Sequence, residues 1–443
     1  MRTLALISMA LMLAAVARHN DDSDAQLYSV VARNMVRDGT WTQLSYAPNV
    51  HAVFREHLPF GFWPGAFALR IGGERALLFV APLFTLGTLA ALAWLAKRLM
   101  LSAPLAVLAL ISTEAFLFTS TAFRLDAPLV CLSLLAAVAP LIFERPSWRG
   151  AALSVFAATA ATLIKGPFGL VPLVAAGLAR VLITPTARLR WLWWTVGCAL
   201  ISSLALSAFL LHAWWTGSDW WSGFAQQQLF ASALGTRTDG ERAAWYPLRA
   251  IGEHCWPWLP LTLLGMWPAR HKATARLLTL WLALMCVALA LPSRKLWHHT
   301  LIAFPACALL AASVVERLRT WLTRPVALGA LGAAALCFVA LTPRGRAVSC
   351  SAFSAPLARV LPDEPIFVAQ SASGGHWREI STLLYERQLS PWLIDHPQEL
   401  ESQRAALALV PVDFPVPGKW TELSRARGWR LLERDGQLSA RSN

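Results

Sequence analysis

Long apolar runs, separated by short polar stretches, dominate the pattern of hydrophobic and polar positions along this chain. A helix of roughly 15 to 20 apolar residues spans the hydrocarbon core of a bilayer with all of its backbone groups hydrogen-bonded. About 11 such runs are found, at residues 3–17, 76–96, 101–119, 126–143, 150–164, 167–183, 191–211, 256–268, 275–292, 299–316 and 325–342. The shortest two, 150–164 and 256–268, are also compatible with re-entrant or broken helices. The pattern predicts an all-α polytopic membrane protein.

Composition and charge support this class of protein. Of the 443 residues, 56% are apolar and 14% are charged, whereas a soluble domain has roughly 25% charged residues. The net charge of +14 would suggest a nucleic-acid partner in a soluble protein. Here the basic residues lie in short connections between the apolar runs. They are therefore interpreted as determinants of membrane orientation, and no nucleic-acid partner is predicted.

The basic residues also predict the membrane topology. They follow every second apolar run, at Lys97, Arg98, Arg145, Arg149, Arg188, Arg190, Arg270, Lys272, Arg276, Arg317, Arg319 and Arg324. The positive-inside rule assigns these connections, and the N-terminus with Arg2, to the cytoplasm. An odd number of spans then puts the C-terminus outside. A cleavable signal peptide ending near Ala17 is an alternative for the first run, and it leaves the following loop on the same exterior side.

The first exterior loop, residues 18–75, is expected to contain amphipathic helices. Ser23 and Gln26 form a capping-box pattern, the helix continues through "DAQLYSVVARNMVRD", and Gly39 is a typical residue to follow its end. Four apolar positions share one face of this helix: Leu27, Val30, Val31 and Met35. This face predicts a helix that lies along the membrane surface.

The C-terminal tail differs in composition from the rest of the chain. Three segments have the pattern of strands, at residues 364–371, 405–414 and 428–441, with helical stretches at 374–388 and 397–404. We therefore predict two domains. A membrane domain covers residues 1–342, and a small extracytoplasmic α/β domain covers residues 343–443.

Ionisable side chains occur where the apolar runs meet the exterior. In or near hydrocarbon such groups are costly, so their presence points to function. They come from four separate connections: Asp24, Arg124, Asp126, Lys165, Lys295, His298 and His299. Each taken alone also has a structural explanation. Asp24 would interact with the helix dipole, Arg124 and Asp126 would form a local ion pair, and the lysines and histidines would reach the interface.

As a set, these residues suit transfer of a group from a phosphate-linked donor. A carboxylate can accept the proton of an attacking hydroxyl or hold a divalent cation, and Lys, Arg and His side chains neutralise a phosphate leaving group. A second carboxylate is consistent with shared metal ligation or with positioning of the acceptor. If the phosphate is carried by a lipid, such a site must lie at the membrane surface.

The order and spacing of six short segments resemble the membrane glycosyltransferases of the GT-C fold. The particular resemblance is to family 39, with the bacterial 4-amino-4-deoxy-L-arabinose lipid A transferases and the protein O-mannosyltransferases. The segments are "DAQLYSVVARNMVRDGTW", "FREHLPFGFW", "FRLDAPL", "KGPFGLVP", "CWPWLPL" and "SRKLWHHTLIAFP". The resemblance covers about residues 1–342. It implies a hexosyl- or pentosyltransferase that moves a sugar from a polyprenyl-phosphate donor to lipid A, a glycan or a protein, with inversion at the anomeric carbon. It also implies a bacterial inner membrane, a periplasmic active site and a periplasmic C-terminal domain.

The resemblance further implies roles for residues of the first exterior loop. The D-E-x-x-Y motif of the family maps onto Asp24, Ala25 and Tyr28, which makes Asp24 a catalytic or metal-binding acid and leaves Ala25 in place of the common Glu. The K-P-P-L-like segment maps onto "HLPF", which begins at His57. The loss of its Lys and first Pro predicts altered contacts to donor or acceptor. The residues expected to contact substrate are Tyr28, Glu56 and His57.

Later segments supply the remaining implied site residues. Asp126 corresponds to the acidic position of the second exterior loop, so it is the second catalytic acid, and it shares with Asp24 the expected binding of a divalent metal ion. The expected ligands of the donor phosphate are Arg124, Lys165, Lys295 and His298.

Two other classes of protein remain open. A transporter or flippase for a lipid-linked sugar would use the same cations to hold a phosphate, but transporters usually contain internal repeats with paired broken helices, and no convincing repeat is found. An assembly protein with a decayed site is the third reading, which Ala25 and the altered "EHLPF" segment keep open. The partners expected of the enzyme are a polyprenyl-phosphate-linked sugar, a lipid or glycan acceptor, and membrane lipids.

Overall fold

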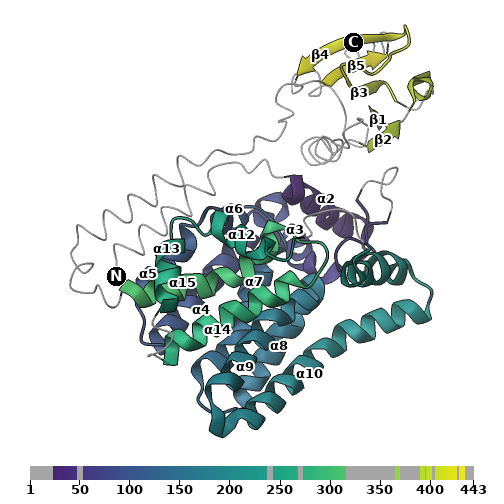
Figure 1. The fold of residues 1–443 in the computed structure, drawn as a ribbon. Coiled ribbons are helices and arrows are strands. Elements are labelled where there is room, and N and C mark those ends of the chain that lie inside the picture. Colours follow the sequence, from purple (N-terminus) through teal and green to yellow (C-terminus); the bar gives the residue numbers. More distant parts are fainter. Residues whose placement is uncertain are drawn as a thin grey trace. The chain divides into compact units, whose positions relative to one another are not determined.

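The computed structural model describes most of the membrane domain and part of the tail (Figure 1). The described residues are 23–46, 53–236, 243–267, 273–315, 365–369, 390–394, 396–401, 405–426 and 429–434. They belong to two compact units, a helical unit with residues 55–64 and 78–315 and a second unit with α2, most of α3 and the tail, and each is described separately. The expected runs 3–17 and 325–342 and the expected helix 374–388 lie outside the described residues.

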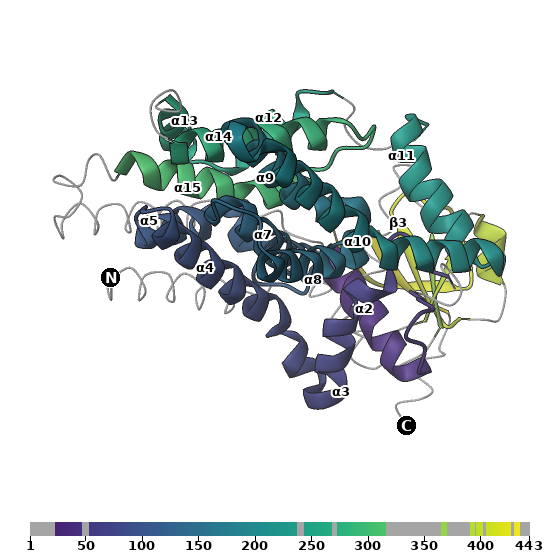
Figure 2. The same cartoon turned by 90° about the horizontal axis from the view of Figure 1, so that it is seen from below.

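The helical unit is a bundle of apolar helices, as the sequence predicts (Figures 1 and 2). The α-helices are α4 (Val80–Arg98), α5 (Ala103–Ile111), α6 (Glu114–Thr119), α7 (Asp126–Ile142), α8 (Trp148–Lys165), α9 (Val171–Ile183), α10 (Arg188–Trp215), α11 (Ala231–Leu234), α12 (Tyr246–His254), α13 (Leu259–Met266), α14 (Ala273–Ala290) and α15 (Phe304–Val315). The 3-10 helices are η1 (Pro59–Gly61), η2 (Gly166–Leu170), η3 (Pro185–Ala187) and η6 (Trp297–Ala303), and η4 (Trp220–Phe230) is a π-helix.

Five helical segments among the described residues are long and apolar enough to cross a membrane. They are Val80–Arg98, Trp148–Ile183, Pro185–Trp215, Ala273–Ala290 and Trp297–Val314. Helix α7 is a shorter apolar helix. The chain is therefore a multi-pass membrane protein, although the predicted number of about 11 spans is not confirmed.

The predicted span over residues 101–119 is wrong as a single helix, because the chain forms α5 and α6 with a break between them. The Ser112 hydroxyl donates to the carbonyl of Leu108 at 2.6 Å, and the Thr113 hydroxyl donates to the carbonyl of Leu110 at 2.8 Å. Such side-chain bonds compete with the helical hydrogen-bond ladder. The indole N–H of Trp258 also donates to the Ser112 hydroxyl at 2.7 Å. Hydropathy does not reveal a break made by two small polar residues.

The two shortest predicted apolar runs, 150–164 and 256–268, differ in the length of the helix that they form. Residues 150–164 belong to α8, which has 18 residues and continues through η2 into α9. Within the described residues 256–267, the run contains the 8-residue helix α13, which is too short to cross a membrane as a single helix.

Helix α7 is the central element of the bundle. It packs against α4, α8 and α9 (Figure 2), and most of its side chains are buried. Alanines from α7 and α8 lie in one buried cluster, with Ala136, Ala157 and Ala158 fully buried. The Ser154 hydroxyl donates to the carbonyl of Ala136 at 2.7 Å. Small residues at such interfaces let helix backbones approach closely in a membrane.

Two glycines bring η1, α7 and α8 together at one end of the bundle. A Cβ on Gly169 in η2 would lie 2.4 Å from backbone atoms of Ala161 and Thr162, so η2 folds back directly onto α8. A Cβ on Gly61 in η1 would lie 3.3 Å from the carbonyl oxygen of Ile164 and 3.2 Å from the side chain of Leu125. The ends of these elements therefore meet, and they carry the candidate site.

The second unit begins with α2 (Ser23–Asp38), which is followed by Gly39 at a φ of +68°. This confirms the predicted helix and its stop. Val30, Val31 and Met35 are buried, but so are Tyr28 and Asn34, so burial is not restricted to the predicted apolar face. Location of α2 on a membrane surface stays a prediction.

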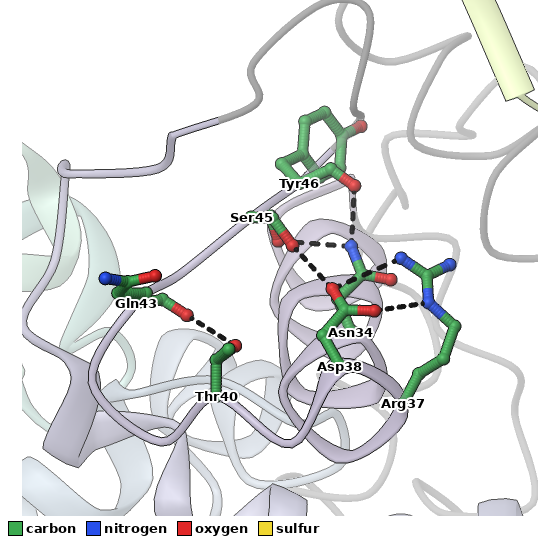
Figure 3. A network of polar contacts seen from close by, with 7 residues as sticks. All are labelled: Asn34, Arg37, Asp38, Thr40, Gln43, Ser45 and Tyr46. Carbon is green, nitrogen blue, oxygen red and sulfur yellow. Dashed lines mark hydrogen bonds and ion pairs between the residues drawn. The ribbon is translucent and has the colours of Figure 1, made fainter.

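A polar network holds the loop that follows α2 (Figure 3). The side-chain amide of Asn34 donates to the carbonyls of Ser45 and Tyr46 at 3.1 and 2.8 Å. Asp38 accepts from Arg37 at 2.8 Å and from the Ser45 hydroxyl at 3.4 Å. Helix α3 (Trp63–Leu77) supplies Glu74, which pairs with Arg33 of α2 at 2.8 Å. These contacts hold α2, the described part of the loop after it and α3 to one another.

The tail contains a small five-stranded sheet, as the fold prediction required. Its strands are β1 (Pro365–Ala369), β2 (Ser390–Ile394), β3 (Leu407–Pro411), β4 (Trp420–Ala426) and β5 (Trp429–Arg434), in the order β2-β1-β3-β5-β4. Strand β1 pairs in parallel with β2 and β3, whereas β3 and β4 pair antiparallel with β5. Strands β2 and β4 were not predicted. The 3-10 helix η8 (Pro397–Glu401) occupies part of the predicted helix at 397–404.

Candidate active site

A buried carboxylate, Asp126, lies at the centre of the candidate site. The ammonium of Lys165 donates to its Oδ1 at 2.6 Å, and Nε of Arg124 donates to its Oδ2 at 3.3 Å. Asp126 is 1% exposed, Arg124 2% and Lys165 8%. Buried charges require partners, and here one carboxylate has two cations.

The helix ends explain why these three residues meet. Asp126 occupies the first turn of α7, and Lys165 is the last residue of α8. A negative charge is stabilised at a helix N-terminus and a positive charge at a helix C-terminus. Gly166, at a φ of +64°, ends α8 and turns the chain into η2. Local sequence therefore fixes each charge, and the α7–α8 packing brings the charges together.

Aromatic rings enclose the guanidinium of Arg124. The Cζ atom of Arg124 lies 5.6 Å from the ring centroid of Phe118 and 5.8 Å from the ring centroid of Trp297. Trp297 also contacts the rings of His254 at 5.1 Å and His298 at 5.6 Å. Sequence reasoning missed Trp297 and Phe118 as site residues, and the only signal for Trp297 was its position beside the two histidines.

His57 lies beside the same charges, in the loop that precedes η1 and outside the apolar helices. Burial and the Lys165 ammonium lower the pKa of His57 to about 3, and the Asp126 carboxylate opposes this effect. Arg294 and Arg124 also lower the pKa of His57. Arg294 was not predicted as a site residue, although it lies in the quoted segment "SRKLWHH".

The η6 segment adds the two neighbouring histidines. The rings of His298 and His299 are 4.8 Å apart, and that of His299 is 4.5 Å from Phe168 in η2. Both histidines interact electrostatically with Lys165 and Asp126. Lys295 is buried, and its ammonium donates to the carbonyl of Pro292 at 2.7 Å.

A cation–π contact holds the loop that carries His57. The guanidinium of Arg55 lies 4.3 Å from the ring centroid of Trp220 in η4 and 4.0 Å from the carboxylate of Asp219. A Cβ on Gly223 would lie 2.6 Å from the Arg55 side chain, so only glycine admits this arrangement. Sequence reasoning did not identify this contact.

The structure thus brings together Asp126, Arg124, Lys165, His57 and His298 from the predicted set. Other predicted residues are placed differently. Asp24, partly exposed in the first turn of α2, and buried Tyr28 belong to the second compact unit. Glu56 is exposed next to His57. The roles assigned to these residues stay predictions.

The donor set around Asp126 does not fit a divalent metal ion. Both carboxylate oxygens face a cation, and a divalent ion there would meet the charges of Lys165 and Arg124 directly. Within the described residues, no group of three or more His, Cys, Asp or Glu side chains is arranged to hold a metal. The expected metal role of Asp126 therefore has no support from its surroundings.

The cluster has an excess of positive charge around one carboxylate. Arg124 and Lys165 already outnumber Asp126, and Arg294 adds to the field at His57. Fixed cations in a desolvated site stabilise negative charge more strongly than cations in water. The arrangement can bind an anion and stabilise negative charge that develops on it.

This fold and site define a polytopic membrane protein with a cation-rich centre at one end of its helix bundle. Two crystal structures of ArnT from Cupriavidus metallidurans are similar to this chain in fold. The structure bound to undecaprenyl phosphate has a TM-score of 0.74, and the apo structure has a TM-score of 0.72. In each case the identity is 15%, and the match covers 98% of this chain and 98% of the other chain. The mostly helical, ArnT-like architecture with a small C-terminal sheet is therefore shown for this chain. No protein-family model matches the chain, and no curated protein sequence matches it.

Proposed function

We propose that this protein is a membrane glycosyltransferase that moves a sugar from a polyprenyl-phosphate donor to an acceptor. The observation that carries the proposal is the buried pair of cations around Asp126, Arg124 from the segment before α7 and Lys165 from the end of α8. The similarity in fold to a protein crystallised with undecaprenyl phosphate supports it.

The chemistry follows from the charges. The acceptor oxygen attacks the anomeric carbon of the sugar, the bond from that carbon to the phosphate oxygen breaks, and the electron pair leaves with the polyprenyl phosphate. Negative charge therefore grows on the phosphate, where Arg124 and Lys165 stabilise it. Asp126 holds both cations in place. Direct displacement of this kind inverts the anomeric carbon.

The proton of the acceptor hydroxyl needs a base, and Asp24 is the proposed base. It is a carboxylate in the first turn of an exterior helix. Tyr28, one turn later in α2, and Glu56 are proposed contacts of donor or acceptor. Lys295 and His298 complete the proposed phosphate contacts.

The proposed setting is a bacterial inner membrane with the active site on the periplasmic side. The basic connections support a cytoplasmic N-terminus, and an odd number of spans would then put residues 343–443 in the periplasm. The acceptor is then a lipid, glycan or protein that reaches the exterior face.

A reconstituted transfer assay tests the function. Purified protein in detergent with lipid is given a radiolabelled polyprenyl-phosphate sugar pool and membrane extract, and label in new acceptors is measured for wild type and Asp24→Asn. The matched control is Asp38→Asn, at the other end of the same helix. Transfer by wild type and the control, but not by Asp24→Asn, is expected. Undiminished transfer by Asp24→Asn would remove the base assignment.

A second assay distinguishes a glycosyltransferase from a flippase. Proteoliposomes containing the same labelled lipid are assayed for movement of label across the bilayer. Movement across the bilayer without transfer to any acceptor would replace the glycosyltransferase by a transporter.

A further inference from the structure

The guanidinium of Arg124 contacts two aromatic rings that come from distant parts of the chain. Its Cζ atom lies 5.6 Å from the ring centroid of Phe118 in α6 and 5.8 Å from the ring centroid of Trp297 in η6. The two rings are 6.2 Å apart and are tilted by 56° to one another. A cation within about 6 Å of a ring centroid is attracted to the ring, most strongly where water is excluded. Arg124 is 2% exposed, so both contacts are desolvated.

The hydrogen bond between Arg124 and Asp126 does not by itself orient the guanidinium. It joins Nε to Oδ2 at 3.3 Å, whereas the ammonium of Lys165 donates to Oδ1 at 2.6 Å. A single long hydrogen bond constrains a planar group weakly. A guanidinium binds phosphate through two parallel N–H groups, so its plane must be aligned with the phosphate oxygens, whereas an ammonium acts as a point charge. Arg124 therefore needs further contacts that Lys165 does not need.

The ring of Trp297 is itself held in place by its neighbours. Trp297 is the first residue of η6, and its carbonyl accepts from the Thr300 hydroxyl at 2.7 Å. Its ring centroid lies 5.1 Å from that of His254 in α12 and 5.6 Å from that of His298. A functional group is held precisely when the side chains that support it are fixed by their own packing. The contacts of Trp297 are of this supporting kind.

We propose that Phe118 and Trp297 are positioning residues, which hold the guanidinium of Arg124 in the orientation that binds the phosphate of the lipid donor. The inference rests on the proposed function, because it needs a phosphate at Arg124. Loss of a ring leaves the charge of Arg124 in place and removes only its alignment. A misaligned cation stabilises the negative charge that grows on the phosphate less well. Neither ring has to contact the substrate for this role.

Binding of the leaving group of the proposed reaction tests this role. Full-length protein in detergent with lipid is titrated with a radiolabelled polyprenyl phosphate, at a temperature well below the Tm of every variant. Trp297→Leu and Phe118→Leu should each raise Kd about tenfold, since each removes one desolvated cation–π contact. Trp297→Phe and Phe118→Tyr keep an aromatic face and should bind within about threefold of wild type. The two positions give independent tests, so the failure of one leucine variant to fold leaves the other.

The matched control is Trp194→Leu, which makes the same substitution elsewhere in the helical unit. Trp194 is a partly buried residue of α10, and its indole N–H donates to the carbonyl of Ser147 at 3.3 Å. No contact between Trp194 and Arg124 is found among the described residues. This variant should bind polyprenyl phosphate as wild type does.

A double-mutant cycle distinguishes positioning from general packing. Arg124→Gln removes the guanidinium but keeps an amide that can donate to Asp126. In this background Trp297→Leu should raise Kd by less than about twofold, because no guanidinium is left to align. A tryptophan that only fills space, or that contacts the lipid itself, would cost as much binding in this background as in the wild-type protein.

Each outcome has a definite meaning. Wild-type affinity in either leucine variant overturns the inference, as does an equal loss in the ring-conserving variants or in the Arg124→Gln background, and each of these results leaves the proposed donor class intact. No binding of polyprenyl phosphate by the wild-type protein overturns both the donor class and the inference. A loss that the aromatic replacements restore, and that disappears without Arg124, supports both.

Discussion

Two polar networks of this protein are built on opposite principles. Around Asn34 and Asp38, in the loop after α2, donors and acceptors are matched and most partners are backbone carbonyls or exposed side chains (Figure 3). Around Asp126, side chains from separate helices are buried together and positive charge exceeds negative charge. A network in which donors and acceptors are paired stabilises a loop. A buried cluster with an excess of positive charge can instead attract an anionic ligand.

The physical cost of the two networks differs accordingly. Hydrogen bonds to backbone carbonyls satisfy groups that would otherwise be costly to bury. A buried ion pair costs desolvation energy that its own attraction often fails to offset. The presence of three charged side chains at 8% exposure or less, those of Arg124, Asp126 and Lys165, is therefore better explained by function than by stability.

The largest effect is expected for Lys165→Met. It leaves the buried Asp126 with one cation, so the unfolding free energy should fall by about 3–5 kcal/mol, and transfer should fall on the order of 10²–10³-fold. Thermal unfolding in detergent and the transfer assay measure both quantities. Lys97→Met, at an exposed position in α4, is the control. The triple variant Arg124→Met/Asp126→Asn/Lys165→Met leaves no buried charge of this cluster unpaired, so it should regain stability but not transfer. Recovery of transfer would show that the cluster is purely structural.

A moderate effect is expected for Asn34→Ala, which tests the matched network. The loss of one buried and one part-buried hydrogen bond to backbone carbonyls should lower stability by about 1–3 kcal/mol. Transfer at a temperature well below Tm should be unchanged. A large loss of transfer with Tm intact would contradict the structural reading of this loop.

A smaller effect concerns the pH dependence of stability. The folded chain keeps His57 neutral down to about pH 3, whereas the unfolded chain protonates it as the pH falls through about 6.5. Because the unfolded state then binds more protons, this residue lowers stability as the pH falls from about 6.5 towards 3 and has no such effect above 6.5. Between pH 7 and pH 5, Tm of His57→Gln should therefore fall less than that of wild type, by about 2 °C. An identical fall in both proteins would mean that His57 is charged in the folded state.

The smallest effect is expected for Arg37→Ala. The pair of Arg37 and Asp38 is 2.8 Å long, but the Arg37 side chain is 51% exposed, so solvent screens the interaction. Stability should change by less than about 0.5 kcal/mol, as measured by Tm in low and high salt. A change comparable to that of Asn34→Ala would show that this exposed pair is part of the stabilising network.

Particular elements show how far sequence reasoning reached. The α2 helix and its stop at Gly39 were predicted because both depend on local chemistry. Three of the five strands were predicted from their own apolar patterns, whereas β2 and β4 were not. Residues 101–119 were assigned a single span, and two hydroxyl groups break it.

The sequence also predicted some residues of the candidate site and missed others. The cost of charge in an apolar setting identified Arg124, Asp126 and Lys165 from the sequence alone. The packing of Trp297 on Arg124 and of Arg55 on Trp220 was not foreseen, since tryptophan is common throughout this chain and carries no positional signal.

The sequence by itself determined the class of protein, the helix α2 with its stop at Gly39 and the residue types of the site, because hydropathy, capping and charge act over a few neighbouring residues. Only the tertiary structure decided which charges meet. Asp126 and Lys165 are 39 positions apart, and the approach of α7 to α8 through small residues joins them. Pairing over such separations depends on the packing of whole helices, which no local pattern specifies.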